Sequence, residues 1–542
     1  MPRRSQDGPE SDRTQSYTRR EFAAAAGTAG LALAALGGAP KAWAAAEGDA
    51  AAPARQGPMN VVIITTDDND AEALGCFGCP LPGITPRMDA LAGQGMRFNH
   101  AHTVSPTCQP TRLSLMTGRY PQTNGNTGHV DPLKPGVPTL ATELKRAGYY
   151  TAIVGKQSNY LPNEAFDWDR YGETADAWED DDGYWGMWRN PEGMHRGTLE
   201  LIGEAREQGK PFFLHMNTSD PHRPWPGSVD EVWQLEMFEK QWGGKRPKPL
   251  RPYPKNYSPW EVPVPAYLAD LPGVRVDVAQ YYSGMHQADL AVGRVLDAID
   301  QTGEADRTIV ICFGDQGAPF PGSKQNLYDV STRIPLLIRW PGVTPAGAVT
   351  DHTMVEVIDL MPTLLEGLGL PLPEGMDGRS ILPVLRGERT AAREYVQKSY
   401  NYALPGVQAF PMRAVQSMDY LFIWNAWPGE RNIDPDIPLV YDGHIDPLTG
   451  LCWKSMKEAA ERDPELAKRV EFLKYRAPEE FYDLRTDPYC LTNLIDAPEH
   501  KARIDAMRDM VVAQMERTED PLLAKFHGTG PIPPEWRTLK RS

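Results

Sequence analysis

The sequence has few cysteines and no long apolar segment. Its 542 residues contain six cysteines, too few for a disulfide-dense scaffold in a chain of this length. The one Ala-rich apolar stretch, residues 23–39, is interrupted by four glycines. It is also shorter than the roughly 20 residues that a helix needs to cross a bilayer. We therefore expect no membrane span after processing.

Basic residues are outnumbered. The chain has 56 Lys and Arg against 72 Asp and Glu, a net charge of −16. This balance argues against general binding of nucleic acid or of an anionic membrane. Internal repeats and low-complexity domains are also lacking. With 41% hydrophobic residues the chain can bury a large core, and its length favours two domains.

The first 44 residues resemble an export signal. Thr18-Arg19-Arg20-Glu21-Phe22 precedes the apolar stretch, and Ala42-Trp43-Ala44 offers a cleavage site between small residues. This pattern is similar to a bacterial twin-arginine signal peptide, the alternative being a disordered Ala/Gly-rich tail. We expect a periplasmic or secreted protein. Twin-arginine export carries folded proteins, so a side chain can be modified in the cytoplasm first.

Four short apolar runs each lead into polar residues. The runs are residues 59–66, 149–154, 211–216 and 308–313, and the polar residues are Asp67-Asp68, Lys156, Asp220-Pro221-His222 and Asp315-Gln316. Continuous, β-branched runs of this length are typical of strands buried on both faces. Helix-compatible stretches separate them, which predicts a mostly parallel sheet with helices on both sides. Ligands bind at the carboxyl ends of such strands, so these polar residues should gather at one edge.

Residues 105–119 predict a helix that begins at a cysteine. Cys108 and Arg112 are four residues apart and would share one helix face. Pro110 suits the first turn, where its missing N–H has no intrahelical partner to lose. A helix N-terminus beside an arginine attracts an anion. The alternative is an inert buried cysteine at an ordinary helix start.

The segment Cys108-Gln109-Pro110-Thr111-Arg112, with Thr117-Gly118-Arg119 after it, resembles the signature of the type I sulfatases. Four further segments resemble that family and, most closely, its N-sulfoglucosamine sulfohydrolases, the sulfamidases. They are residues 219–223 (SDPHR), 314–328 (GDQGAPFPGSKQNLY), 411–416 (PMRAVQ) and 480–488 (EFYDLRTDP). The resemblance extends from about residue 60 to about residue 519.

The resemblance implies an α/β fold of the alkaline-phosphatase-like sandwich type, with a mostly parallel central sheet. The predicted catalytic domain spans residues 45–393. A smaller C-terminal α+β domain with an antiparallel sheet follows at residues 394–542, with strands expected within 396–424 and helices at 462–475 and 501–517. This second domain would complete one wall of the pocket.

The resemblance also assigns chemistry. In this family the cysteine is oxidised by a formylglycine-generating enzyme to 3-oxoalanine (formylglycine), whose hydrated aldehyde is the nucleophile. A divalent cation, Ca²⁺ in preference to Mg²⁺, would be held by the side chains of Asp67, Asp68, the modified Cys108, Asp315 and Gln316. Such hard ions prefer oxygen ligands.

The catalytic set that the resemblance implies surrounds this cation. Cys108 supplies the nucleophile and Asp315 is a plausible base. Arg112 holds the nucleophile, and Lys156 and Lys324 bind the sulfate oxygens. His222 would protonate the departing atom. The substrate would be a sulfated carbohydrate, most closely one with the N-sulfate of glucosamine.

Three residues depart from the family pattern. Ser158 replaces a histidine that sulfatases commonly place two residues after the lysine, and serine is not a general base at neutral pH. Gln316 replaces the usual asparagine and reaches one methylene further. Lys324 is found in most sulfatases, whereas the sulfamidases place an arginine there.

Several alternatives stay open. The enzyme could be an O-sulfate ester glycan sulfatase or a phosphonate or phosphate ester hydrolase of the same superfamily. A glycan-binding pseudo-sulfatase is the non-catalytic alternative. Two insertions, residues 166–188 and 223–265, carry tryptophans that either stack on sugars or anchor loops, and the second also carries a basic run, residues 245–251. The Cys76-Phe77-Gly78-Cys79 segment has the spacing of a zinc or redox site, but a structural turn is favoured.

Overall fold

The computed structural model describes residues 57–129, 131–172, 189–241, 244, 248–401, 409–428 and 450–533. The predicted signal peptide, residues 1–44, lies outside these ranges. None of the helices in the described ranges is long and apolar enough to span a bilayer.

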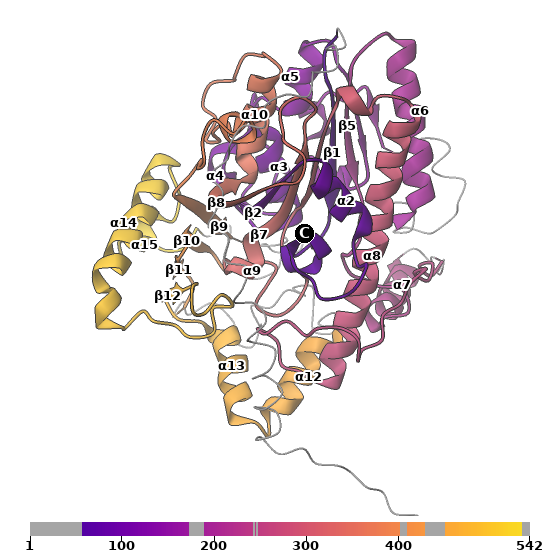
Figure 1. The fold of residues 1–542 in the computed structure, drawn as a ribbon. Coiled ribbons are helices and arrows are strands. Elements are labelled where there is room, and N and C mark those ends of the chain that lie inside the picture. Colours follow the sequence, from indigo (N-terminus) through magenta and orange to yellow (C-terminus); the bar gives the residue numbers. More distant parts are fainter. Residues whose placement is uncertain are drawn as a thin grey trace, which may run out of the picture. The chain divides into compact units, whose positions relative to one another are not determined.

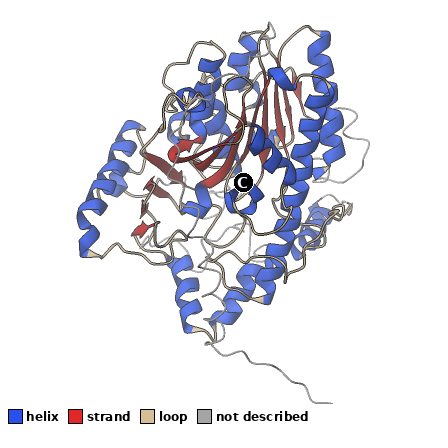
Figure 2. Cartoon of the chain, viewed as in Figure 1, coloured by secondary structure: helices blue, strands red, loops and turns tan. Residues whose placement is uncertain are grey.

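A mixed sheet of eight strands forms the centre of the fold, in the order β4-β3-β5-β1-β6-β7-β2-β8 (Figures 1 and 2). In chain order the strands are β1 Asn60–Thr66, β2 Met96–His102, β3 Tyr150–Val154, β4 Arg170–Tyr171, β5 Phe212–Asn217, β6 Thr308–Gly314, β7 Arg333–Arg339 and β8 Ala348–Glu356. The four predicted apolar runs are therefore β1, β3, β5 and β6, and they lie side by side.

Most neighbouring strands run parallel. Strand β1 pairs in parallel with β5 and β6, so that Val62 lies opposite both Leu214 and Val310. Strands β3 and β4 continue the parallel part, and β2 pairs in parallel with β8. Within the described part of this sheet, β7 is the one strand that is antiparallel to both of its neighbours. The prediction of a mostly parallel sheet is confirmed.

The central strands are apolar throughout because each face of the sheet contacts a separate core. Val62 and Ile64 of β1 belong to one hydrophobic cluster, whereas Val61 and Ile63 belong to the other. Successive side chains of a strand point to opposite faces, so both sets must be apolar when helices cover both sides.

Different helices contribute to the two cores. Helices α2 (Pro86–Gln94), α6 (Pro191–Glu207) and α8 (Pro272–Gln301) pack on the first face. Helices α3 (Cys108–Thr117), α5 (Leu140–Arg146), α10 (Leu360–Gly367) and α11 (Leu382–Leu385) pack on the second. The remaining helices of the described chain before residue 450 are α4 (Pro121–Asn124), α7 (Val229–Gln241) and α9 (Asp329–Thr332), besides short 3₁₀ turns.

A second sheet, of four antiparallel strands, follows in the order β12-β11-β10-β9. Its strands are β9 Tyr395–Tyr400, β10 Met412–Ser417, β11 Tyr420–Asn425 and β12 Glu479–Asp483. The described helices after residue 450 are α12 Gly450–Ala460, α13 Pro464–Tyr475, α14 Lys501–Arg517 and α15 Leu523–Phe526. The C-terminal antiparallel sheet is thus confirmed, and helices α13 and α14 match the predicted ones closely. The domain limits at residues 45, 393 and 394 stay predictions.

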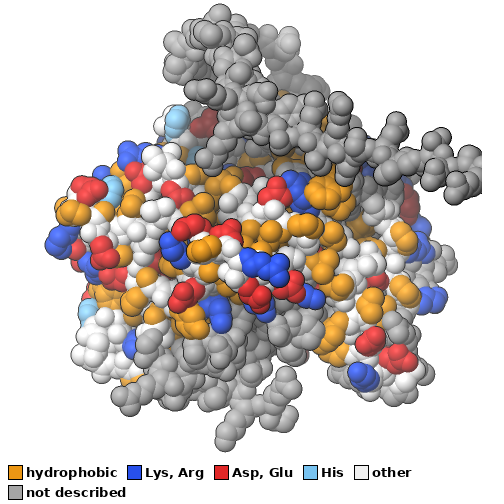
Figure 3. Space-filling model, turned by 90° about the horizontal axis from the view of Figure 1, so that it is seen from below, with side chains coloured by type: hydrophobic (Ala, Val, Ile, Leu, Met, Phe, Trp, Pro, Cys, Tyr) orange, Lys and Arg blue, Asp and Glu red, His pale blue; other side chains and the backbone are white. Residues whose placement is uncertain are grey.

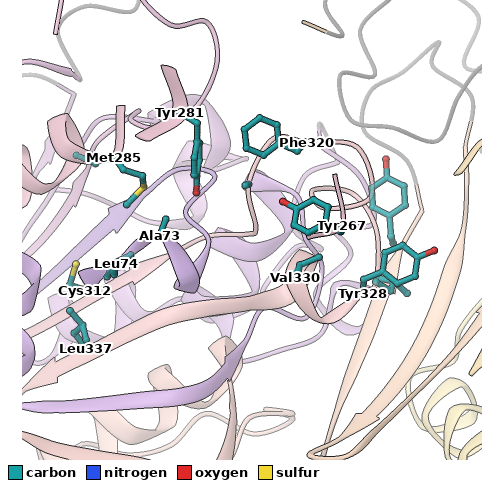
Figure 4. Close-up of a cluster of buried hydrophobic side chains, with 14 of the residues drawn as sticks. Ala73, Leu74, Tyr267, Tyr281, Met285, Cys312, Phe320, Tyr328, Val330 and Leu337 are labelled. Carbon is teal, nitrogen blue, oxygen red and sulfur yellow. The ribbon is translucent and has the colours of Figure 1, made fainter. Parts of the chain in front are cut away.

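The second sheet supports a loop that leads back to the first. Arg476 donates to Asn326 Oδ1 at 2.8 Å, and Tyr328 donates to Glu480 at 3.0 Å. Phe320, at the start of this loop, packs edge-on against Tyr281 of α8, with 5.3 Å between ring centroids (Figure 4). Lys324 lies between these two anchors and is buried. The loop is therefore held from both sides of the fold.

The surface seen in Figure 3 mixes charges of both signs. Acidic and basic side chains alternate across the described part of that face, with apolar side chains between them. The excess of acidic residues is therefore dispersed there rather than collected in one patch.

Candidate active site

The ends of the four parallel strands meet at one edge of the sheet. Asp67 follows β1, and its backbone N–H donates to the carbonyl of Asp220, after β5, at 3.2 Å. Asp315 follows β6, and its N–H donates to the carbonyl of Thr66 at 3.2 Å. Lys156 follows β3 and forms an ion pair with Asp67, 2.6 Å from Nζ to Oδ2. The expected gathering of polar strand ends is confirmed.

Unusual backbone conformations hold these residues in place. Asp68 and Lys156 have positive φ angles of 62° and 54°, a left-handed region that few non-glycine residues occupy. Gly155, before Lys156, has φ 75°, and a Cβ there would lie 2.1 Å from the carbonyl oxygen of Asn217. Only glycine lets the backbone approach so closely. The sharp turn after β3 directs Lys156 toward Asp67.

Helix α3 begins at Cys108, as predicted, and all ten of its residues are buried. The Cys108 thiol lies 3.3 Å from Asp67 Oδ1. One turn later, Arg112 donates to Asp315 Oδ2 from Nη2 at 2.8 Å and from Nε at 3.1 Å, and its Nη2 lies 3.3 Å from Asp67 Oδ2. Spacing of four residues thus places both side chains on the face that meets the strand ends.

Two further basic groups complete the cluster. Lys324 Nζ lies 2.5 Å from Asp68 Oδ1, and His222 Nε2 lies 3.9 Å from Asp68 Oδ2. The His222 Nδ1–H donates to the carbonyl of Arg223, which leaves Nε2 facing the cluster. The three buried carboxylates of Asp67, Asp68 and Asp315 are balanced by Arg112, Lys156 and Lys324.

The donor set fits a hard divalent cation. Ligand atoms of Asp67, Asp68, Cys108 and His222 all lie within 4.8 Å of one another. Gln316 Nε2 lies 2.6 Å from Asp68 Oδ1 and 3.1 Å from Cys108 Sγ, while its Oε1 is buried without a partner. The amide N and O are nearly interchangeable in shape, so a half-turn of the amide presents Oε1 to a cation among the carboxylates. Asp68 Oδ2 is a second buried oxygen without a hydrogen bond.

Burial and charge shift the pKa values in this cluster in opposite directions. Burial raises the pKa of Asp68, and it raises that of Asp315 to about 7 with help from the neighbouring Asp67 charge. Burial acts on Asp67 too, but the attraction of Lys156 and other cations outweighs it and holds that pKa well below its usual range. Burial, with Lys324 and Lys156 nearby, lowers the pKa of His222 well below its usual range.

Cys108 itself is a poor nucleophile as a thiol. Burial and the Asp67 charge raise its pKa to about 12, whereas reactive cysteines have depressed pKa values in electropositive surroundings. These surroundings therefore disfavour the thiolate form of Cys108.

The structure brings together all nine residues predicted from the sequence. Each of them contacts at least one other member: Asp67, Asp68, Cys108, Arg112, Lys156, His222, Asp315, Gln316 and Lys324. Their individual roles stay predictions. Ser158 lies in a 3₁₀ turn directly after Lys156 and is exposed.

The described tryptophans of the two insertions differ in their surroundings. Trp225 is fully buried, with Arg223 stacked 4.2 Å from its ring centroid, and Trp168 stacks on Phe166. These two are loop anchors. Trp260 is 74% exposed. Trp233 lies on α7. Trp178, Trp185, Trp188 and Trp242 lie outside the described residues, as do residues 245–247. Cys76 and Cys79 are both free thiols in a short turn after β1.

Sequence reasoning missed several residues around the cluster. Asn217, the last residue of β5, accepts from Arg112 and from Tyr160. Arg189 pairs with Asp220 at 3.1 Å and donates to the carbonyl of His222. Tyr253 also bonds to both Arg189 and Asp220. Asn217 directly follows a predicted apolar run and could have been noticed; Arg189 and Tyr253 lie in irregular segments without a motif.

Two family models match the chain. The sulfatase model matches residues 59–370, more than half of the chain. The model for the C-terminal part of N-sulphoglucosamine sulphohydrolase matches residues 322–428, which include the Lys324 loop and strands β9 to β11.

The chain is also similar in sequence to individual members of this family. The chain is 27% identical to human N-sulphoglucosamine sulphohydrolase over 482 residues, 86% of this chain and 92% of the relative. It is 26% identical to an ulvan-active sulfatase of Formosa agariphila over 480 residues, 88% of this chain and 84% of the relative.

Solved structures share the fold. BT4656, in complex with its substrate D-glucosamine-2-N,6-O-disulfate, aligns with a TM-score of 0.61 at 18% identity, over 86% of this chain and 99% of that one. The phosphonate monoester hydrolase of Silicibacter pomeroyi aligns with a TM-score of 0.57 at 18% identity, over 86% and 97%. The predicted alkaline-phosphatase-like sandwich is confirmed. Together with the match of the family model to most of the catalytic region, this shows that the chain is a hydrolase of the sulfatase family.

Proposed function

We propose that this enzyme hydrolyses a sulfate group from a sulfated sugar, and that the N-sulfate of glucosamine is its substrate group. The observation that carries the proposal is the buried cluster at the sheet edge, where Cys108 adjoins a cation-binding set of oxygens and two lysines. The likeness of the C-terminal part to N-sulphoglucosamine sulphohydrolase supports the N-sulfate.

The proposal includes formylglycine at Cys108, made by a formylglycine-generating enzyme during maturation. Hydrated formylglycine would supply the hydroxyl nucleophile for attack on sulfur, and a cation held by Asp67, Asp68, Asp315 and Gln316 would supply positive charge toward the anionic sulfate. The high pKa of the unmodified thiol agrees with a need for this modification. Ca²⁺ is the proposed cation, because the donor set is all oxygen once Gln316 turns its amide.

The residues around the nucleophile bind the sulfate and hold the carboxylates in position. Arg112 fixes the position of Asp315 and Asp67 through its guanidinium. Lys156 and Lys324 reach the cluster from opposite loops and can transfer their ion pairs from Asp67 and Asp68 to sulfate oxygens. A fixed, buried lysine stabilises the charge that develops in the transition state more strongly than one in water does.

His222 protonates the departing group from Nε2 and must be in its imidazolium form to do so. Without substrate, burial, Lys324 and Lys156 lower the pKa of His222, and an anionic sulfate that pairs with these lysines favours the protonated ring. The Nδ1–H of His222 is held by the Arg223 carbonyl, so Nε2 is the atom that exchanges a proton with the departing nitrogen. Arg189, which donates to the carbonyl of His222, keeps this ring in position.

A sulfate ester is the second candidate substrate group. Lys156, Lys324 and the cation-binding oxygens of the cluster would contact the sulfate group itself, which an N-sulfate and an O-sulfate share, and His222 would face the departing atom of either. BT4656, which shares the fold, is bound to a sugar that carries both an N-sulfate and a 6-O-sulfate.

The rates of sulfate release from glucosamine N-sulfate and from glucosamine 6-sulfate distinguish the two candidate substrate groups. With the mature enzyme and Ca²⁺, we expect glucosamine N-sulfate to be hydrolysed with a kcat/KM at least about tenfold above that of glucosamine 6-sulfate, a difference of about 1.4 kcal/mol. Ion chromatography of released sulfate measures both rates. The reverse order would contradict the N-sulfate proposal and leave an O-sulfatase. Turnover of a phosphonate monoester alone would contradict the sulfatase activity itself.

Cation binding has a readout that is independent of activity. We expect a chelator to lower the melting temperature and Ca²⁺ to restore it, because a ligand that binds only the folded state stabilises it by mass action. The shift should be absent in Asp68→Asn and retained in Asp505→Asn, whose carboxylate lies on the exposed side of α14. An equal Ca²⁺ shift in both variants would place the ion elsewhere.

We also propose that residues 1–44 direct twin-arginine export to the periplasm or the medium. The support is the paired arginine before an apolar stretch and a small-residue cleavage site. N-terminal sequencing of the exported protein would then begin shortly after Ala44.

A further inference from the structure

A cavity of about 280 Å³ lies behind the catalytic cluster. Its lining comes from the start of α6, the segment around residues 250–254 and helix α8. The volume is near the lower end for sites that hold small organic ligands, about 300 Å³, so it accommodates a single sugar unit.

The cavity is separated from the cluster by a layer of buried side chains. Arg189 and Tyr253 line the cavity and are only 5% and 6% exposed. Both bond to Asp220, whose carbonyl accepts from Asp67. The cavity is therefore distinct from the place where sulfur is attacked, yet it shares a wall with the loop that carries His222.

The lining is rich in guanidinium groups. Arg189, Arg251 and Arg294 line the cavity, and among the described lining residues Glu192 is the one carboxylate. Arg294 pairs with Glu192 at 2.5 Å, and Arg251 is exposed. Arg189 Nε is buried and has no hydrogen-bond partner. Guanidinium groups suit planar or tetrahedral oxyanions such as carboxylate and sulfate.

The buried Oε1 of Gln287 needs a ligand that can donate a hydrogen bond, which an oxyanion alone does not do. Gln287, 9% exposed, donates its Nε2–H to the carbonyl of Arg189 at 2.6 Å, which fixes the orientation of the amide. Its Oε1 is buried without a partner, and such an acceptor is unfavourable until a ligand donates to it. Inorganic sulfate has no proton to donate at neutral pH, whereas the hydroxyl or amine of a sugar does. Tyr253, Pro252 and Pro254 add an apolar wall for a ring face.

We propose that this cavity is a second binding site, for a sugar unit that carries an anionic group such as a sulfate. The choice of a sulfated sugar as the ligand rests on the proposed function. The guanidinium groups bind the anion, Gln287 Oε1 accepts from a hydroxyl or amine, and the ring lies against Tyr253. Binding there contacts Arg189, the residue that holds the His222 carbonyl.

Calorimetric titration with glucosamine 6-sulfate tests the site on full-length Cys108→Ala protein, which cannot turn the probe over. Lys156→Ala is added to weaken binding at the catalytic cluster. We expect binding to persist in this double variant. It should weaken about tenfold or more when Arg251→Ala is introduced, since a charge-assisted hydrogen bond is lost. Arg146→Ala, an exposed arginine on α5 outside the cavity, should leave the affinity unchanged.

Each outcome has a defined meaning. Binding that depends on Lys156 and not on Arg251 overturns the second site and leaves the proposed function intact. Arg251-dependent binding in a mature enzyme that releases no sulfate supports the second site and contradicts only the proposed function. Inorganic sulfate should bind at least tenfold more weakly than glucosamine 6-sulfate; equal affinity overturns the assignment to a sugar.

Discussion

The Cys108→Ala variant is expected to release no measurable sulfate, a loss of about 10⁴-fold or more, because removal of a covalent nucleophile leaves only binding and charge stabilisation. The thiol lies 3.3 Å from Asp67 and belongs to the fully buried start of α3. Ion chromatography of sulfate released from glucosamine N-sulfate measures the loss. Mass spectrometry of the Cys108 peptide from the exported wild-type protein should show an aldehyde in place of the thiol.

Cys76→Ala is the matched control. Cys76 is half-buried in the turn after β1 and hydrogen-bonds through its backbone N–H to Asp89, a bond that alanine keeps. We expect this variant to retain full activity. Full activity in Cys108→Ala, or a wild-type enzyme that is active with an unmodified thiol, would contradict the formylglycine mechanism.

Replacement of Arg112 by methionine is expected to lower the free energy of unfolding by about 3–5 kcal/mol, the usual cost of removing one partner of a buried ion pair. Arg112 is 0% exposed and bonds to Asp315, Asp67 and Asn217. Methionine fills the volume but leaves two buried carboxylates with less compensating charge. Urea denaturation followed by circular dichroism measures the change, and sulfate release should be lost as well.

Two comparison variants show whether the loss of stability comes from the buried ion pairs of Arg112. Arg146→Ala removes an arginine that is 71% exposed and paired with Glu143, so its cost should stay within about 0.5 kcal/mol. Arg112→Lys keeps the charge but not the planar fork, and it should be intermediate in stability. If Arg112→Met were as stable as Arg146→Ala, the ion pairs would not contribute to the folded state as we infer.

Much of the central sheet could be predicted because its strands are buried on both faces. The runs around Val61–Ile64 and Ile309–Cys312 are apolar at every position, and each is followed by the polar residue that forms the site. Parallel strands bring such ends to one edge by geometry alone. Spacing within α3 similarly fixed which face carries Cys108 and Arg112.

The contacts of irregular segments could not be predicted in this way. Arg189 and Tyr253 are 64 residues apart, and no local pattern indicates that they meet at Asp220. The same is true of Arg476, whose side chain reaches Asn326 from 150 residues away. Loops take their positions from the elements that they pack against, and these positions depend on the whole fold.

The sequence by itself determined the four parallel strands β1, β3, β5 and β6, the strands and helices expected near the C-terminus and the sulfatase signature, because strand and helix patterns and local motifs are formed by neighbouring residues. The set of nine residues followed from the resemblance to the sulfatases. Tertiary structure alone decided three other features. It formed the charge-balanced cluster, since burial in one place removes water from three carboxylates at once. It set the orientation of His222 through the hydrogen bond of its Nδ1–H to the Arg223 carbonyl. It also created the cavity behind His222, whose lining combines segments more than 30 residues apart that only packing against α8 brings together.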